Sequence, residues 1–126
     1  MKSFVIPCAV LASLLVLSLW NGKWLTQHCE NWTAQLHAID ERAAEDNWEA
    51  AAEQLDALYR NWQQVQTWLH ITMEHDALNE AESLFCRAAV LAEEEDSVEF
   101  RAHIAELCSA LQLLSEMEQL RVENVL

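Results

Sequence analysis

Five histidines are the residues of this sequence best suited to chemistry, because imidazole serves both as a metal ligand and as a general base. They are His28, His37, His70, His75 and His103. Di-iron helical bundles place a histidine three residues after a glutamate on one helix face. The residues three before these histidines are Leu25, Ala34, Thr67, Thr72 and Phe100, none of them acidic. We therefore expect no metal site of this kind.

Two of the histidines flank a predicted boundary between helices. His70 and His75 are five residues apart, about 140° around a helix, so they cannot chelate a metal together from one helix. Asp76, a residue type common at helix caps, directly follows His75. We interpret His75 as a hydrogen-bonded residue at a helix junction, with metal ligation as the alternative.

The four cysteines, at positions 8, 29, 86 and 108, form no C-x-x-C or zinc-binding pattern. Cys29, Cys86 and Cys108 fall on different predicted helices, where buried thiols are the ordinary interpretation. A Cys86–Cys108 disulfide is the alternative, in an oxidising compartment. Nothing indicates a base beside a thiol or hydroxyl. The sequence therefore predicts no catalytic residue, no cofactor and no enzymatic activity.

Six tryptophans are a high number for 126 residues. Trp20 and Trp24 follow an apolar segment, as membrane-interface anchors do. The other four lie on or beside apolar stripes, which favours core packing; they are Trp32, Trp48, Trp62 and Trp68. Since Trp62 and Trp68 are six residues apart, they face different directions, and one of them is a candidate for a groove or partner surface.

Charge is distributed very unevenly along the chain. All 21 acidic residues lie at or after Glu30, whereas residues 24–126 contain five arginines and no lysine, a net charge of −16. Such a surface repels phosphate backbones, so we exclude nucleic-acid binding. A solvated, soluble surface is the ordinary interpretation, and attraction of cations or of a basic partner is the alternative.

The N-terminal segment resembles a membrane-spanning helix. Residues 4–20 are uncharged and mostly apolar, and seventeen helical residues span about 25 Å. A cleaved signal peptide is the competing interpretation, but small residues are missing at suitable positions before a cleavage site. We expect residues 1–23 to be an uncleaved anchor and residues 24–126 an acidic domain. Lys2 with the α-amino group lies before the apolar segment and Lys23 after it. This small excess of positive charge at the N-terminal side favours a single-pass cell-membrane protein with the acidic domain outside the cytoplasm.

The remaining chain is expected to be helical. Glycine and proline occur once each, so the tight turns of a β-sandwich or barrel are missing. The predicted fold class is all-α: an N-terminal transmembrane helix followed by a small antiparallel helical bundle or stacked α-hairpins.

Apolar residues recur at helical spacing along four stretches. The stripes are Leu25, Cys29, Trp32, Leu36 and Ile39; Trp48, Ala52, Leu55, Leu58, Tyr59, Trp62, Val65 and Leu69, of which positions 48, 55, 62 and 69 are seven apart; Leu78, Ala81, Phe85, Ala88 and Ala92, widened by Leu84 and Leu91; and Phe100, Ile104, Leu107, Cys108, Leu111, Leu114 and Met117. Two pairs of residues, Asp46 with Glu49 and Asp96 with Glu99, have the spacing of a capping box, which predicts the start of a helix at each pair. No glycine or proline marks the break near Asp76, so two helices and one bent helix both stay open there.

Several segments, in this order, resemble a known family of short anchored bacterial proteins. They are the apolar segment, DNWEAAAEQLDALYRNW at 46–62, Trp68, HDALNEAE at 75–82, Arg87 and the terminal ENVL. The chain is similar to the domain of unknown function 4363 family, found mainly in Firmicutes. The resemblance implies fold and anchoring but no activity, and suggests a membrane partner of the YetF-like kind. The candidate family-motif or interaction residues are Trp48, Trp62, Trp68, His75, Glu82, Arg87 and Asn124.

These features together favour an interaction protein. We expect an accessory or scaffolding module, anchored through residues 4–20, that docks another membrane or envelope protein or a second copy of itself. The alternative is a cation- or small-ligand-binding sensory module, in which acidic side chains and histidines share a pocket.

Overall fold

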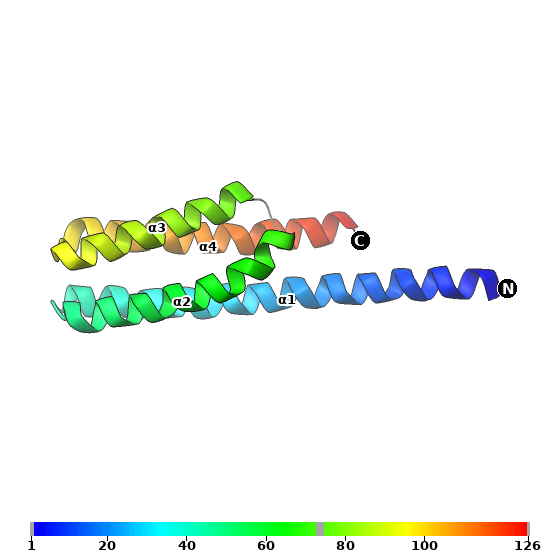
Figure 1. The fold of residues 1–126 in the computed structure, drawn as a ribbon, viewed down its shortest axis with the longest axis horizontal. Coiled ribbons are helices and arrows are strands. Elements are labelled where there is room, and N and C mark those ends of the chain that lie inside the picture. The colour runs from blue at the N-terminus through cyan, green and yellow to red at the C-terminus, as the bar shows by residue number, and fades with distance from the viewer. Residues whose placement is uncertain (1, 73–74, 126) are drawn as a thin grey trace.

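Figure 1 shows a helical protein in which one helix projects far beyond the others. This computed structural model describes residues 2–72 and 75–125, and within them the side chains other than those of residues 2, 21, 72 and 121–125. The described residues form four helices: α1 (Lys2–Ala44), α2 (Trp48–Thr72), α3 (His75–Glu94) and α4 (Ser97–Val125). The predicted all-α class is confirmed, and α2 and α3 are two helices lying side by side rather than one bent helix.

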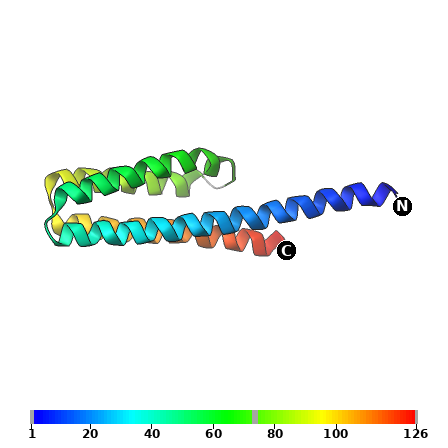
Figure 2. The same cartoon turned by 90° about the horizontal axis from the view of Figure 1, so that it is seen from below.

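The helices pack as an antiparallel bundle. Each helix contacts its two neighbours, in the order α1, α2, α3, α4 and back to α1, as short connections between successive helices require. Figures 1 and 2 show the N-terminal part of α1 extending beyond one end of this bundle. We call that end the base. The opposite end, which carries the α1–α2 and α3–α4 turns, is the tip.

The apolar segment and the first helix of the bundle are one continuous helix. From Ser3 to Trp20 the side chains of α1 are exposed, and burial begins at Gly22 and Leu25. An isolated glycine costs a helix only about 1 kcal/mol, so packing against α2 and α4 carries α1 past Gly22. No flexible linker separates the two parts. This one helix, among those described, is long and apolar enough to cross a membrane.

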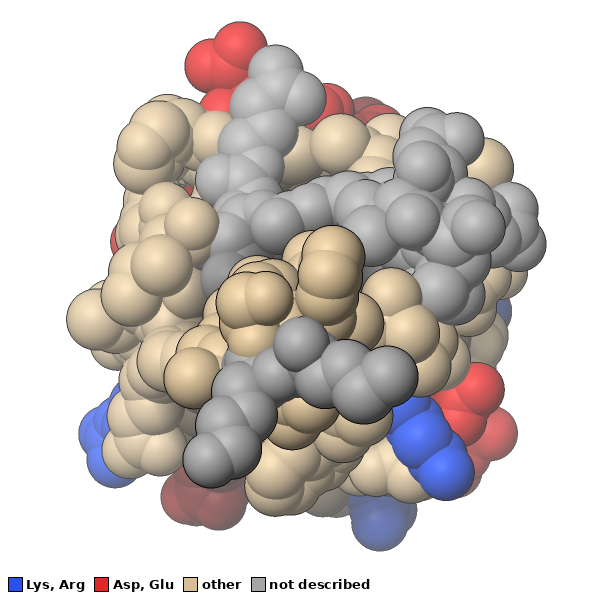
Figure 3. Space-filling model, turned by 90° about the vertical axis from the view of Figure 1, so that its right-hand side faces the viewer, with Lys and Arg blue, Asp and Glu red and all other residues tan. Residues whose placement is uncertain are grey.

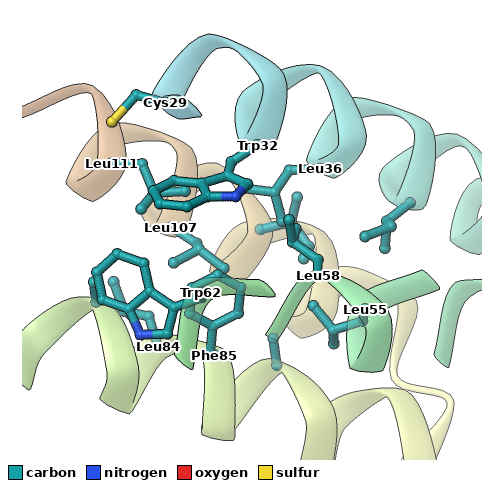
Figure 4. Close-up of a cluster of buried hydrophobic side chains, with 14 of the residues drawn as sticks. Cys29, Trp32, Leu36, Leu55, Leu58, Trp62, Leu84, Phe85, Leu107 and Leu111 are labelled. Carbon is teal, nitrogen blue, oxygen red and sulfur yellow. The ribbon is translucent and has the colours of Figure 1, made fainter. Parts of the chain in front are cut away.

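The four predicted stripes form the core. Most of their members are buried, whereas Tyr59, Leu91, Cys108 and Met117 are half-buried and Ala52 is exposed. Figure 4 shows how side chains from all four helices meet. An aromatic row crosses the core, because Trp32 of α1 packs edge-on against Trp62 of α2 at 5.5 Å and Trp62 lies 5.6 Å from Phe85 of α3. These contacts hold three helices at a defined rotation.

Both turns at the tip have the same construction. Asp46 and Glu95 adopt φ values of 60° and 55°, the left-handed conformation that ends a helix in a Schellman motif. In the first turn Asn47 N donates to Arg42 O at 2.9 Å, and in the second Asp96 N donates to Leu91 O at 3.2 Å. The residue after each left-handed position, Asn47 or Asp96, caps the next helix.

The predicted cap of the second helix was displaced by one residue. Asn47, not Asp46, caps α2, because Ala50 N donates to Asn47 Oδ1 at 3.4 Å. Asp46 is occupied in ending α1. The predicted cap at Asp96 is confirmed, since Glu99 N donates to Asp96 Oδ1 at 3.2 Å.

Candidate functional site

A groove runs between α2 and α3 on the tip half of the bundle. Its volume is about 480 Å³, and we call it the α2–α3 groove. Its lining residues are Ala52, Leu55, Asp56 and Tyr59 from α2 and Phe85, Cys86, Ala89, Ala92 and Glu93 from α3. Small alanine side chains leave the space open, while Leu55 and Phe85 supply an apolar floor. Exposed Asp56 and Glu93 give it an acidic rim.

A chain of polar side chains starts in this groove and runs towards the base. Tyr59 Oη donates to Glu82 Oε1 at 2.9 Å, and Gln66 Nε2 donates to the second oxygen of the same carboxylate. Burial and the hydrogen bond to Glu82 raise the pKa of Tyr59, so the hydroxyl stays protonated as the donor. Glu82, a predicted candidate, therefore connects α2 to α3.

The chain of polar side chains ends in a pair of histidines. His70 and His75 lie on different helices, α2 and α3, and their Nδ1 atoms are 2.8 Å apart. The prediction from their spacing applied to a single helix, and it did not foresee that the two side chains meet across the junction. His75 does lie at the helix junction.

The hydrogen-bond geometry determines the tautomers of this pair. Gln66 Nε2 lies 3.2 Å from His70 Nε2, and an amide nitrogen is a donor. His70 Nε2 is then the acceptor, so its Nδ1 carries the hydrogen and donates to His75 Nδ1.

A second apolar groove lies at the base, and we call it the base groove. Its volume is about 410 Å³. It is lined by Leu17, Trp20 and Trp24 of α1 and by Gln64, Val65 and Trp68 of α2. Trp68 is 51% exposed, whereas Trp62 is 0% exposed in the core. Trp68 is therefore the tryptophan of the two that lies at a groove.

A third groove, between α1 and α4, is polar. Its volume is about 540 Å³, and we call it the α1–α4 groove. Its lining residues are Thr26, Cys29, Glu30, Thr33, His37, Gln112, Ser115, Glu116 and Gln119. Nearby, Glu118 is only 4% exposed. The sequence reasoning missed this carboxylate, although positions 111, 114 and 118 continue the buried spacing of α4.

The cysteines are free thiols. Cys86 faces α2, where its Sγ lies 3.8 Å from Tyr59 Oη, and no disulfide joins it to Cys108. Burial, reinforced by Glu30, raises the pKa of Cys29 to about 12. Burial, reinforced by Asp40, also raises the pKa of Cys108. Neither of these two thiols is activated as a nucleophile.

The other predicted residues are dispersed over the bundle. Trp48 is buried near the tip, where its ring meets that of Phe100 at 5.3 Å. Arg87 is exposed and lines a shallow hollow beside α4. The side chain of Asn124 lies outside the described residues. Within the described part of the chain, no three His, Cys, Asp or Glu side chains come together in a way that could hold a metal ion.

These features define an antiparallel four-helix bundle carried on a helix apolar enough to cross a membrane, with open grooves between its helices. The chain belongs to the family called Domain of unknown function (DUF4363), whose model matches residues 19–125. The match covers all four helices of the bundle and begins where the exposed apolar segment ends. No curated protein and no solved structure matches the chain.

Proposed function

We propose that this protein is a non-catalytic, membrane-anchored interaction module. Residues 4–20 anchor it, and the α2–α3 groove binds a helix of another membrane or envelope protein. A YetF-like membrane protein is a candidate partner. The observation that carries the proposal is the groove itself: an open apolar hollow of about 480 Å³ with alanines at its sides. Grooves of this kind accept the apolar face of an amphipathic helix.

The charge of the groove's rim indicates the chemistry of the bound helix. Glu93 lies at one side of the apolar floor and Asp56, which pairs with Arg60 at 2.8 Å, at the other, and the surrounding domain has a net charge of −16. A partner helix with lysines or arginines beside its apolar face complements that rim, which speeds encounter and sets orientation. We therefore assign the groove to an apolar helix flanked by basic residues.

Filling the groove tests this assignment. Ala89 lines the groove, and Ala105 is an exposed alanine on α4, a matched site on another helix. We expect Ala89→Trp to abolish co-purification of a membrane partner from native membranes, whereas Ala105→Trp retains it. Glu93→Lys should weaken the same complex.

Several results would refute the groove assignment. Equal retention of the partner by Ala89→Trp and Ala105→Trp would do so. If the retained species were a second copy of this chain, the module would be a homo-oligomer instead.

We further propose that the bundle lies outside the cytoplasm. Val98, at the tip, is 78% exposed and suits a labelling site. In a background without the native thiols, Val98→Cys in intact cells should react with a membrane-impermeant maleimide. Labelling only after lysis would place the bundle, and its partners, in the cytoplasm.

A second candidate function is binding of a cation or small polar ligand in the α1–α4 groove. The observation that favours it is the concentration there of hydroxyls, amides, two exposed glutamates and His37. The measurement is thermal unfolding of the full chain with divalent metals. A rise in Tm beyond that caused by matched ionic strength, removed by Glu30→Gln with Glu116→Gln, supports this function over the first.

A further inference from the structure

The base of the bundle is apolar on the side next to the projecting helix. The base groove joins Leu17 and Trp20 of the apolar segment to Trp68 of α2 in one surface. Ile71, about one helical turn further along α2 towards the base, is 76% exposed. Because α2 runs antiparallel to α1, Trp68 lies beside the part of α1 where the apolar segment ends.

The continuity of α1 determines where this surface must lie. A flexible linker would let the bundle move away from a membrane, but α1 passes from apolar segment to core as one helix. If residues 4–20 cross a bilayer, Trp20 lies at its boundary. The base groove contains Trp20 and Trp68 together, so Trp68 is then held at the same boundary.

The length of the apolar segment supports the same placement. Residues 4–20 span about 25 Å as a helix, less than a hydrocarbon core of roughly 30 Å. A short span is accommodated by drawing flanking groups into the interface. The flanking groups here include three tryptophans, the side chain most favoured at headgroup depth.

The tip of the bundle carries a concentration of acidic residues. Both turns at the tip are acidic, with Glu45 and Asp46 in one and residues 93–96 in the other. Figure 3 looks along the molecule from the end with the projecting helix, so the uncharged apolar segment lies in front of the base and the charged side chains visible there lie towards the rim. An acidic tip is repelled by anionic headgroups and favours the orientation with the base towards the lipid.

We propose that the base is a lipid-binding surface: Trp68 and Ile71 enter the headgroup region of the bilayer, and the bundle stands upright on the membrane. This rests on the proposed anchor of residues 4–20. The bound chemistry is that of phospholipid headgroups and the adjoining acyl chains.

Quenching of tryptophan fluorescence by brominated phosphatidylcholine tests the proposal on the full chain in vesicles. Trp20→Phe with Trp24→Phe removes the two tryptophans of α1 in the base groove, and adding Trp68→Phe gives the matched comparison. We expect several-fold more quenching while Trp68 is present. Val98→Trp, added to the variant that lacks all three, places a tryptophan at the tip and should be quenched by aqueous iodide but not by the lipid.

Each other outcome overturns the proposal in a distinguishable way. Chain released from the vesicles shows that the anchor itself fails. Retained chain whose Trp68 is quenched by iodide as strongly as a tryptophan at position 98 shows a base that stands clear of the bilayer. Protection of Trp68 from both quenchers shows that protein, a partner or a second copy, covers the base. If the triple variant does not fold, comparison of iodide quenching with brominated-lipid quenching of the double variant, which retains Trp68, still decides the exposure of that site.

Discussion

At the scale of single residues, the two central tryptophans have similar packing but opposite polar surroundings. Trp32 Nε1 donates to Asn61 Oδ1 at 2.7 Å. Trp62 Nε1 is buried without an acceptor in the described part of the chain. An unpaired buried donor costs about 1–3 kcal/mol, and a satisfied hydrogen bond contributes roughly 1 kcal/mol.

We therefore predict that Trp32→Phe destabilises the bundle more than Trp62→Phe, by about 2 kcal/mol. Both changes remove the same ring volume, so the comparison isolates the N–H groups. Urea unfolding of the full chain in detergent measures the difference. Equal losses would show that the indole of Trp62 has an acceptor, such as a buried water.

The buried thiol of Cys29 makes the free energy of unfolding depend on pH in the alkaline range. Folding raises the pKa of Cys29 from 9.0 to about 12, so the folded protein holds its proton more tightly than the unfolded chain. The stabilisation is fully present below pH 9 and is lost as pH rises towards 12. The slope approaches about −1.4 kcal/mol per pH unit for one group.

We predict that Cys29→Ala reduces the loss of stability between pH 9 and pH 11, measured by urea unfolding at each pH. Cys108→Ala, at a thiol whose pKa is also raised by burial, should reduce it less because that side chain is only half-buried. An unchanged slope for Cys29→Ala would mean that this thiol is not shielded from water.

At the scale of elements, each turn at the tip requires two different properties of adjacent residues. One residue must adopt the left-handed conformation that ends a helix, and the next must cap the following helix. Glu95 ends α3 in the left-handed conformation, which costs a residue with a Cβ about 1 kcal/mol or more. Asp96 caps α4, which a carboxylate does well. Of these two adjacent residues, Glu95 is therefore poorly suited to its backbone conformation, whereas Asp96 is well suited to capping a helix.

We predict that Glu95→Gly raises the free energy of unfolding by roughly 0.5–1 kcal/mol, because glycine adopts positive φ without steric cost. Asp96→Ala should lower it by about 1 kcal/mol through loss of the cap. Chemical denaturation of the two variants beside the wild type gives both values. The reverse order of stabilities would contradict the assignment of the turn.

At the scale of the whole molecule, charge repulsion opposes folding. The chain has a net charge of −14, and the region from residue 24 onwards has −16. The bidentate Arg101–Asp40 pair, at 2.9 and 3.3 Å, joins α4 to α1, but such exposed pairs contribute little. Salt shortens the range of the repulsion.

We predict that raising NaCl from low concentration to about 0.5 M stabilises the bundle by roughly 1 kcal/mol, or about 4–8 °C in Tm. Replacing Glu93, Glu94 and Glu95 by glutamine should reduce this gain, because it removes repulsion within the tip. Destabilisation by salt would mean that ion pairs outweigh repulsion in this fold.

Local patterns in the sequence determined the helical class, the four buried stripes and the exposed apolar segment. Each depends on residues within a few turns of one helix, where spacing and side-chain type are sufficient. The cap at Asp96 was also predictable. The cap at Asn47 was not, because Asp46 was needed first to end α1.

Only the tertiary structure decided which side chains from different helices meet. The pairing of His70 with His75 and the exposure of Trp68 both depend on how the helices are rotated against each other. The grooves depend on the same rotations. A sequence read along one helix contains the periodicity of its faces, but the neighbour that each face meets is determined by packing across the whole bundle.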